Sequence, residues 1–445
     1  MTCSEISGVA EKLVQAILKR GFEEASAQVY RTKSVMVKFA NSEVSVVQRW
    51  DMFTVGLYMT KEGKILLSEV HPTTFEQVDR LVDRAISASA QLKPSMLYAP
   101  LPEPAEIEKL EGLVDSNVLK TMEDPGPLAE SLLSETSKAD RVAGALTLTY
   151  TEKGLANSRG AKLEEAYTGV EAYLRVFVGE SSGQWSYGSR RLAFDKAKQM
   201  ARTALELAER AEGEPKQIEP GAYDVLLSPM VVGNLVNLVG MMSSALAVLM
   251  GNSIFARVEP GSKVASENFS LFDSPRNPDL LGSTSFDDEA QETRNKAIIE
   301  NGVLKTLLHN SKTAAKFGAQ STGNAGVMFP HAWTLSVNAG DASFDELIEE
   351  MKRGVVITNN WYTRLQNYVE GIFSTIARDA AFYVENGEVK YPVTRVRIAD
   401  RLPKLLSNIE LLGKEVYDIS WWEVNPAVRA PYILARNIGI SRPFV

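Results

Sequence analysis

One stretch of this chain constrains its fold more than any other. From Val225 to Ala256 the sequence runs for 32 residues without an Asp, Glu, Lys or Arg, although these four residue types make up 23% of the chain. A run of this length is either a membrane span or a segment that is buried in the protein core. The residues inside the run decide between the two.

The composition of the run favours a core helix. Gly233, Asn237, Gly240 and Ser244 are three or four residues apart, so a helix places them along one face. Amides and hydroxyls are costly in lipid, and neither flank carries the excess of Lys and Arg that orients a membrane span. We therefore expect a buried helix whose small residues let a strand or another helix approach closely.

The length and the patterning of the rest of the chain predict an α+β fold of two domains. At 445 residues, the chain is too long for a single core. Strand-like text rich in valine and aromatic residues alternates with amphipathic helices, and we expect each domain to hold a mainly antiparallel sheet with packed helices. Glycine and proline bound the stretch from 213 to 221. We therefore place an N-terminal domain at 1–213 and a C-terminal domain at 221–445.

Charge and cysteine content exclude several classes of protein. The chain has 48 Lys+Arg and 56 Asp+Glu, a formal net charge of −8, and it shows no basic cluster, which argues against a nucleic-acid partner. The single cysteine, Cys3, cannot form an intramolecular disulfide and fits a reducing compartment. The N-terminus lacks the pattern of a signal peptide. We expect a cytoplasmic protein without a membrane partner.

Two sets of residues could carry acid–base or metal chemistry. The histidines His71, His309 and His331 are each more than 20 residues from the next, so no helical pair can hold a metal. His309 and His331 could still form a zinc site with a distant carboxylate. The carboxylates of Asp287, Asp288 and Glu289 could bind a cation or act as acid and base. A run of this kind is more often a solvated turn, and this is what we expect here.

The text most typical of a binding surface runs from Asn359 to Arg364. It mixes amides, aromatic rings and an arginine, which suits peptide recognition and also suits a strand end under a neighbouring subunit. We take Asn360, Trp361, Tyr362 and Arg364 as candidates for contact with a substrate or at an interface. The sequence shows no Ser-His-Asp or Cys-His set. We assign no catalytic residue and no metal ligand.

From about residue 253 to residue 415 the sequence resembles the TldD/TldE family of peptidases, whose second member is also called PmbA. The resemblance rests on short motifs that occur in the same order. They are Asn252-Ser253-Ile254-Phe255, Phe286-Asp287-Asp288-Glu289, the segment 298–304, the loop 322–326, Gly371-Ile372-Phe373-Ser374 and the segment 385–389.

The resemblance implies a particular role. TldD members carry H-E-x-x-x-H on the helix before the Asn252-Ser253 motif and a cysteine near the C-terminus, and these residues bind zinc. Between Ser228 and Gly251 this chain has no His, Glu or Cys, and its C-terminal third has no Cys. The resemblance therefore implies a TldE-type subunit without a cofactor of its own. It also implies a TldD-type partner that holds the zinc, and peptides or unfolded proteins as substrates. A homodimer stays open as well.

Two alternatives remain open from the sequence. One is a stand-alone peptidase with an atypical metal site built from His309, His331 and the carboxylates of residues 287–289. The other is a non-enzymatic interaction protein, as an older family name, modulator of DNA gyrase, implies.

Overall fold

The computed structural model describes residues 3–72 and 75–443, and it has the α+β architecture that the sequence predicts. Its strands form three sheets. All strands of the first sheet lie between residues 24 and 189, and all strands of the other two lie between residues 221 and 441. We call these the N-terminal part and the C-terminal part.

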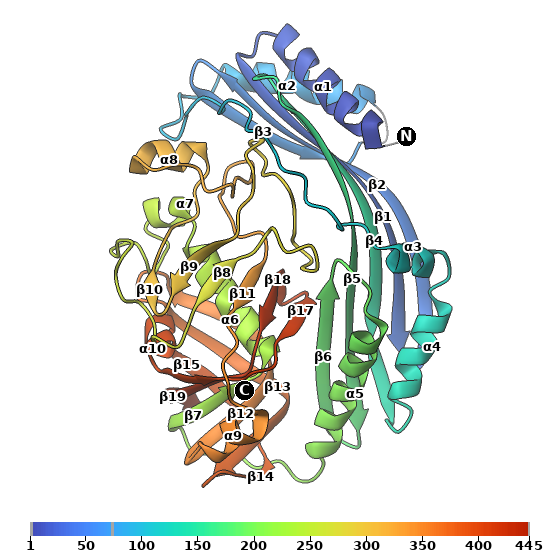
Figure 1. Cartoon of the computed structure of the whole chain (residues 1–445), viewed down its shortest axis with the longest axis vertical. Helices are drawn as coiled ribbons and strands as arrows, with labels where there is room; N and C mark the ends of the chain where they lie inside the picture. The colour runs from blue at the N-terminus through green and yellow to red at the C-terminus, as the bar shows by residue number, and fades with distance from the viewer. Residues whose placement is uncertain (1–2, 73–74, 444–445) are drawn as a thin grey trace.

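The N-terminal part is a six-stranded antiparallel arch with the order β3-β2-β1-β4-β5-β6 (Figure 1). Its four central strands are 17 to 19 residues long, and β-branched and aromatic residues on both faces favour this extended form. The strands are β1 (Glu24–Ala40), β2 (Glu43–Lys61), β3 (Lys64–Val70), β4 (Arg141–Asn157), β5 (Lys162–Val178) and β6 (Ser181–Ser189).

Five helices pack on the arch, with α1 and α2 over its top and α3 and α4 along its outer side (Figure 1). They are α1 (Cys3–Lys19), α2 (Phe75–Ser89), α3 (Ser116–Glu123), α4 (Gly126–Glu135) and α5 (Phe194–Arg210). Ile6, Leu13 and Ile17 of α1 pack on Val29 and Leu57 of the sheet. Their spacing of seven and four residues puts these side chains on one helical face, which explains why α1 lies flat on the sheet.

The C-terminal part holds two sheets with the orders β10-β9-β8-β11-β18-β17 and β12-β7-β19-β15-β13-β14. Their strands are β7 (Gly221–Leu227), β8 (Leu271–Asp273), β9 (Lys296–Glu300), β10 (Val303–Leu304), β11 (Leu335–Val337), β12 (Arg353–Asn367), β13 (Ile372–Glu385), β14 (Glu388–Pro392), β15 (Arg397–Arg401), β16 (Ile409–Leu412), β17 (Tyr417–Trp421), β18 (Val424–Ala430) and β19 (Ile433–Ser441). The helices are α6 (Pro229–Met242), α7 (Ala245–Leu249), α8 (Ser311–Phe317), α9 (Phe344–Glu349) and α10 (Leu402–Ser407). Strand β16 pairs with β19.

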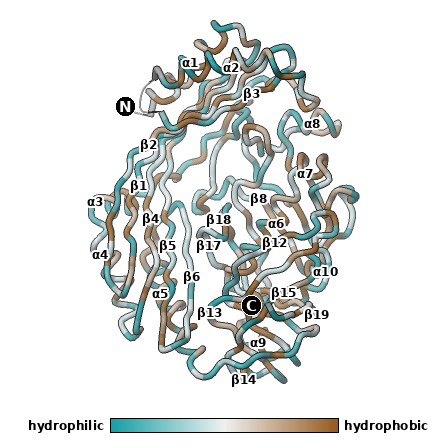
Figure 2. The backbone as a smooth tube through the Cα atoms, turned by 180° about the vertical axis from the view of Figure 1, so that it is seen from behind, coloured by the Kyte–Doolittle hydropathy of each residue, from teal (hydrophilic) through white to brown (hydrophobic). Residues whose placement is uncertain are grey.

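The C-terminal part lies against the inner side of the arch, as both views show (Figures 1 and 2). Arg175 of β5 donates from Nε to Asp379 of β13 at 2.5 Å, and Lys196 of α5 pairs with Asp418 of β17 at 3.1 Å. One hydrophobic cluster also extends from Val35 to Ile440 and so includes both parts. The boundary that we place at 213–221 separates the sheets along the chain. That the two parts are separate domains stays a prediction.

The uncharged run is a core helix, as its composition predicts. Of its residues, 229–242 form α6 and 245–249 form α7, and the chain between them breaks the helix. None of the helices in the described ranges is long and apolar enough to cross a membrane. A Cβ atom added to Gly233 would lie 2.9 Å from Val424, and one added to Gly240 would lie 2.7 Å from Leu335. The small residues therefore let β18 and β11 pack against the helix backbone.

Candidate functional site

The candidate site is a cavity of about 820 Å³ beside α6. Helix α6 starts at Ser228, whose side chain accepts a hydrogen bond from the Val231 N–H, and Pro229 takes the first helical position, where its missing N–H costs nothing. The first residues of α6 therefore determine where the helix begins. One side of the helix then faces the cavity, whose other walls come from residues 329–335, the β12–β13 turn and residues 423–426.

Apolar side chains dominate the open side of this cavity. Met241, Met250, Phe329 and Tyr368 all line it, and each of them is more than 40% exposed. Exposed aromatic and methionine side chains around a concave surface are typical of peptide-binding sites. A cavity of this volume is also within the usual range for ligand-binding sites.

A buried amide network forms the floor of the cavity. The Asn234 Nδ2 group donates to the Glu423 carbonyl at 2.8 Å, and its Oδ1 atom accepts from Asn360 Nδ2 at 2.9 Å and from Thr363 Oγ1 at 2.7 Å. One turn further along, Asn237 Nδ2 donates to the Pro426 carbonyl at 2.9 Å. Two amides of α6 therefore hold Glu423, in the turn between β17 and β18, and Pro426, in β18, in place.

None of the four predicted binding residues lines this cavity, but Asn360 hydrogen-bonds to Asn234, which does. Asn360 is completely buried and belongs to the amide network, so its side chain does not face solvent. Trp361 and Tyr362 are exposed, and so is Arg364, whose guanidinium lies 4.9 Å from the centre of the Tyr362 ring. Burial raises the pKa of the cavity-lining Glu423, while the Tyr362 N–H and the charges of Arg364 and Arg378 oppose this rise. Trp361, Tyr362 and Arg364 stay candidates for contact.

The histidines lie in three different environments. His331 is exposed, lines the cavity and packs edge-on against Trp333 at 4.5 Å. His309 is buried against Phe317, and burial lowers its pKa. His71 is exposed, and its Nδ1 atom lies 3.0 Å from Thr54 Oγ1. Only His331 faces the cavity.

The acidic run 287–289 is not the solvated turn that we expect from its composition. Asp287 and Glu289 are buried. Asp287 accepts hydrogen bonds from three backbone N–H groups, and burial raises its pKa to about 7. Glu289 pairs with the buried Lys312 at 2.5 Å. The prediction is wrong because the fold brings Lys312, which is 23 residues further along the chain, to Glu289 and buries the pair.

The cavity offers no ligand set for a catalytic zinc ion. Such a site takes three protein ligands from His, Cys, Asp or Glu. The α6 residues that line the cavity are two asparagines and three residues without polar side chains, and the other walls add one carboxylate, Glu423, and one imidazole, His331. Within residues 3–72 and 75–443, no three side chains of the ligating types lie close enough to hold a metal ion. The residues at this place therefore do not fit zinc.

Sequence reasoning missed several walls of the site. Phe329, Tyr368 and Glu423 line the cavity but come from three distant segments. None of them belongs to a motif. The one signal near them is the sequence Trp421-Trp422-Glu423 before Asn425-Pro426, because two adjacent tryptophans next to an acidic residue are unusual on a plain surface.

The fold and the site together define an α+β protein that has an uncharged helix beside a cavity large enough for a peptide. Two family models match this chain: the PmbA/TldA metallopeptidase C-terminal domain over residues 220–442 and the PmbA/TldA metallopeptidase central domain over residues 105–212. The chain belongs to the PmbA/TldD family of metallopeptidases.

Individual relatives agree with this assignment. A metalloprotease of Methanothermobacter thermautotrophicus is 28% identical over 329 residues, which cover 68% of this chain and 71% of that protein. The crystal structure of a Thermotoga maritima protein, described as a candidate modulator of a DNA gyrase, is 27% identical. It has a TM-score of 0.82 and covers 99% of this chain and 100% of that chain. TldE from Thermococcus kodakarensis, at 20% identity and a TM-score of 0.82, covers 97% of this chain and 99% of that chain and shares the fold.

Proposed function

We propose that this chain is the non-catalytic, TldE-type subunit of a TldD/TldE-like metallopeptidase complex that degrades peptides or unfolded proteins. In this proposal, the catalytic zinc belongs to a TldD-type partner, and this chain holds no cofactor of its own. The complex works in the cytoplasm, without a nucleic-acid or membrane partner.

The observation that carries the proposal is the chemistry of α6. The chain belongs to a family of metallopeptidases, but its helix beside the cavity presents the amides of Asn234 and Asn237 to that cavity. Amides are poor zinc ligands, and both of these amides donate to backbone carbonyls, one to Glu423 and the other to Pro426 of β18. The helix therefore supports the walls of the cavity and supplies no metal ligand.

A free sheet edge supports the presence of a partner subunit. Strand β2 pairs with β1 along its whole length, but β3 covers only Val55–Lys61 of its other edge. No other described strand pairs with this edge between Glu43 and Thr54, a length of about 40 Å. Val47, Trp50 and Met52 are exposed along it. An open apolar edge of this length invites aggregation unless another chain covers it, and we assign it to the partner.

The cavity supports a peptide substrate. Beside it lies a second cavity of about 440 Å³, and Trp333, Asn425 and Pro426 line both. The second cavity reaches the inner face of the arch at Met36 and Thr147. The two cavities together could guide an extended peptide between the arch and α6, and Trp361, Tyr362 and Arg364 would lie at the rim.

The experiment is co-expression with the TldD-type protein of the same source, followed by a peptide-cleavage assay on each subunit and on both together. We expect cleavage by the complex, no cleavage by this chain alone, and zinc only in the partner. Stoichiometric zinc and peptide cleavage in the isolated chain would instead establish the stand-alone peptidase. His331 and Glu423, which line the same cavity, would be the first residues to replace in that case.

The rim residues can be tested in the same assay. Replacing Trp361, Tyr362 and Arg364 by Ala should lower the affinity for the partner or the rate of peptide cleavage without unfolding the chain, because all three are exposed. If the affinity for the partner and the rate of cleavage both stay unchanged, these three residues contact neither the substrate nor the partner. Salt-dependent binding to DNA, with no effect of this chain on proteolysis, would point to the interaction protein instead.

A further inference from the structure

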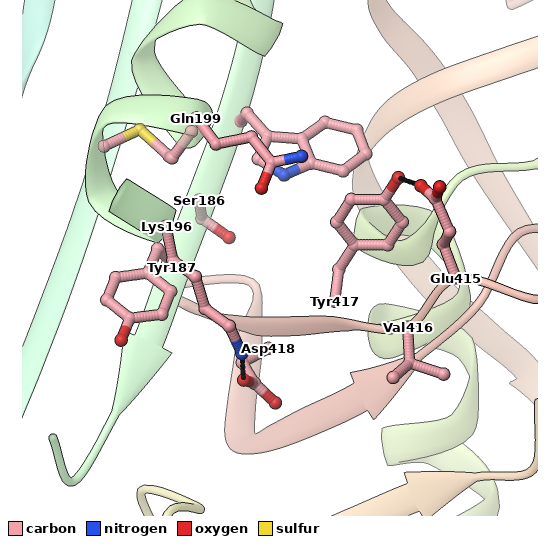
Figure 3. Close-up of a pocket in the computed structure, with 10 residues that line it drawn as sticks. Ser186, Tyr187, Lys196, Gln199, Glu415, Val416, Tyr417 and Asp418 are labelled. Carbon is pink, nitrogen blue, oxygen red and sulfur yellow. Dashed lines mark hydrogen bonds and ion pairs between the residues drawn. The ribbon is translucent and has the colours of Figure 1, made fainter. Parts of the chain in front are cut away.

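A separate pocket of about 300 Å³ lies between the arch and the C-terminal part. Helix α5 and strand β6 form one wall, and the segment from Glu415 to Asp418 forms the other (Figure 3). It shares no lining residue with the cavity beside α6. The pocket is therefore not part of the site described above.

One face of this pocket is apolar and rigid. Trp185 is 3% exposed, stacks on Tyr432 and meets Tyr417 edge-on at 5.4 Å. The buried Met200 and the exposed Val416 complete this face. Because the rings hold one another in place, the apolar face is formed before any ligand arrives, which lowers the entropy cost of binding.

The wall at Asp418 carries an excess positive charge. The Asp418 carboxylate is buried and accepts hydrogen bonds from Arg429 at 2.6 and 3.1 Å, and it also pairs with Lys196 Nζ at 3.1 Å. Two cations on one carboxylate leave a net charge of +1. Lys196 is the more exposed of the two cations, so its ammonium group can still donate to a ligand.

The other end of the segment from Glu415 to Asp418 carries a negative charge. Glu415 is exposed, and its Oε2 atom accepts a hydrogen bond from the Tyr417 hydroxyl at 2.8 Å. Figure 3 shows Glu415 and Lys196 on opposite sides of the space between α5 and β17. The pocket therefore has a cationic end, an anionic end and an apolar face between them.

A buried hydroxyl in the pocket has no partner. Ser186 is 2% exposed, and its Oγ atom makes no hydrogen bond within the described part of the chain. Figure 3 shows this hydroxyl pointing into the pocket, with no hydrogen bond drawn to it. A buried polar group without a partner is unfavourable. A ligand that accepts from Ser186 would remove that cost.

We propose that this pocket binds a small zwitterion, namely a free α-amino acid or a dipeptide with an aliphatic side chain. Its carboxylate accepts hydrogen bonds from Lys196 and Ser186, its ammonium group pairs with Glu415, and its side chain packs on Trp185 and Val416. The volume suits a molecule of this size. The inference concerns the isolated chain and does not depend on the proposed function. Because the two walls come from the two parts of the chain, the ligand would also hold these parts together.

Isothermal titration calorimetry on the full chain tests the inference with four probes. These are L-leucine, leucyl-leucine, 4-methylpentanoate, which lacks the ammonium group, and isopentylamine, which lacks the carboxylate. We expect leucine or the dipeptide to bind at least about threefold more tightly than both single-charge analogues. The zwitterion that binds with the higher affinity tells whether the natural ligand is an amino acid or a peptide. No binding of either zwitterion at about 10 mM, or equal binding of all four probes, would overturn the inference.

Substitutions then locate the site. Glu415→Gln should weaken leucine binding about threefold and leave 4-methylpentanoate binding unchanged, because only the ammonium contact is lost. Glu209→Gln, an exposed position on α5 outside the pocket, is the matched control and should change neither. Glu415 is exposed, so its replacement should not disturb the fold, which circular dichroism checks. Equal leucine affinity in both variants would mean that leucine binds elsewhere and would also overturn the inference.

Discussion

Replacing Asp379 by Ala should strongly weaken the attachment of the C-terminal part to the arch. The Asp379 carboxylate is completely buried. It accepts hydrogen bonds from Arg175 Nε at 2.5 Å, Ser182 Oγ at 2.8 Å and Asn359 Nδ2 at 2.8 Å. Arg175 and Ser182 belong to the arch, whereas Asn359 belongs to the C-terminal part. The substitution leaves all three donors without their acceptor.

The expected loss follows from these contacts. Leaving one member of a buried ion pair uncompensated costs about 3–5 kcal/mol, but Arg175 is 31% exposed and can partly return to water, so about 2 kcal/mol is the better figure. Losing the acceptor of Ser182 and Asn359 adds about 1 kcal/mol each. Asp379 also has a φ of 60°, which Ala adopts less readily than Asp, at a cost of about 1 kcal/mol. The total is about 5 kcal/mol.

The assay is urea unfolding followed by tryptophan fluorescence. The free energy of unfolding is taken from the transition that occurs at the lowest urea concentration. Asp379→Asn is the matched control, because Asn tolerates the same backbone conformation and keeps one acceptor oxygen, and we expect it to lose less than half as much stability. A double-mutant cycle with Arg175→Met isolates the coupling across the interface. A loss below about 1 kcal/mol for Asp379→Ala, or no coupling to Arg175, would refute the reasoning.

Three further changes test other parts of the structure. Because burial raises the pKa of Asp287 to about 7, above its value in the unfolded chain, the folded state binds the proton more strongly, and stability should fall as the pH rises from about 4 to about 7. Urea unfolding across this range should show the slope in the wild type and not in Asp287→Asn. Gly323→Ala should cost about 2–4 kcal/mol, because the new Cβ would lie 2.2 Å from the Glu292 carbonyl oxygen. The control, Gly160→Ala, also has a positive φ but has open space around it, and its thermal unfolding temperature should drop far less. Trp50→Glu on the free edge of β2 should abolish co-purification with the TldD-type partner while the circular dichroism spectrum stays unchanged. If the variant still co-purifies with the partner, this edge is not the proposed interface.

Local patterns in the sequence determine the elements of this protein and the nature of its central helix. The 32 residues without charge could not face water, and the small residues among them could not face lipid, so a buried helix was the remaining solution. The alternation of the long strands and the Asn386-Gly387 turn between β13 and β14 are local in the same way, because side-chain period and turn chemistry act over a few residues. The absence of zinc ligands between Ser228 and Gly251 can also be read directly from the sequence.

Only the tertiary structure decided which residues share a site. Asn234, His331, Tyr368 and Glu423 line one cavity although they are far apart in the chain, because the register of the sheets and the curvature of the arch bring their segments together. The same is true of the buried Glu289, whose countercharge on Lys312 is invisible as a pattern. Whether a charge is solvated or buried depends on what the rest of the chain places beside it, and no short stretch of sequence carries that information.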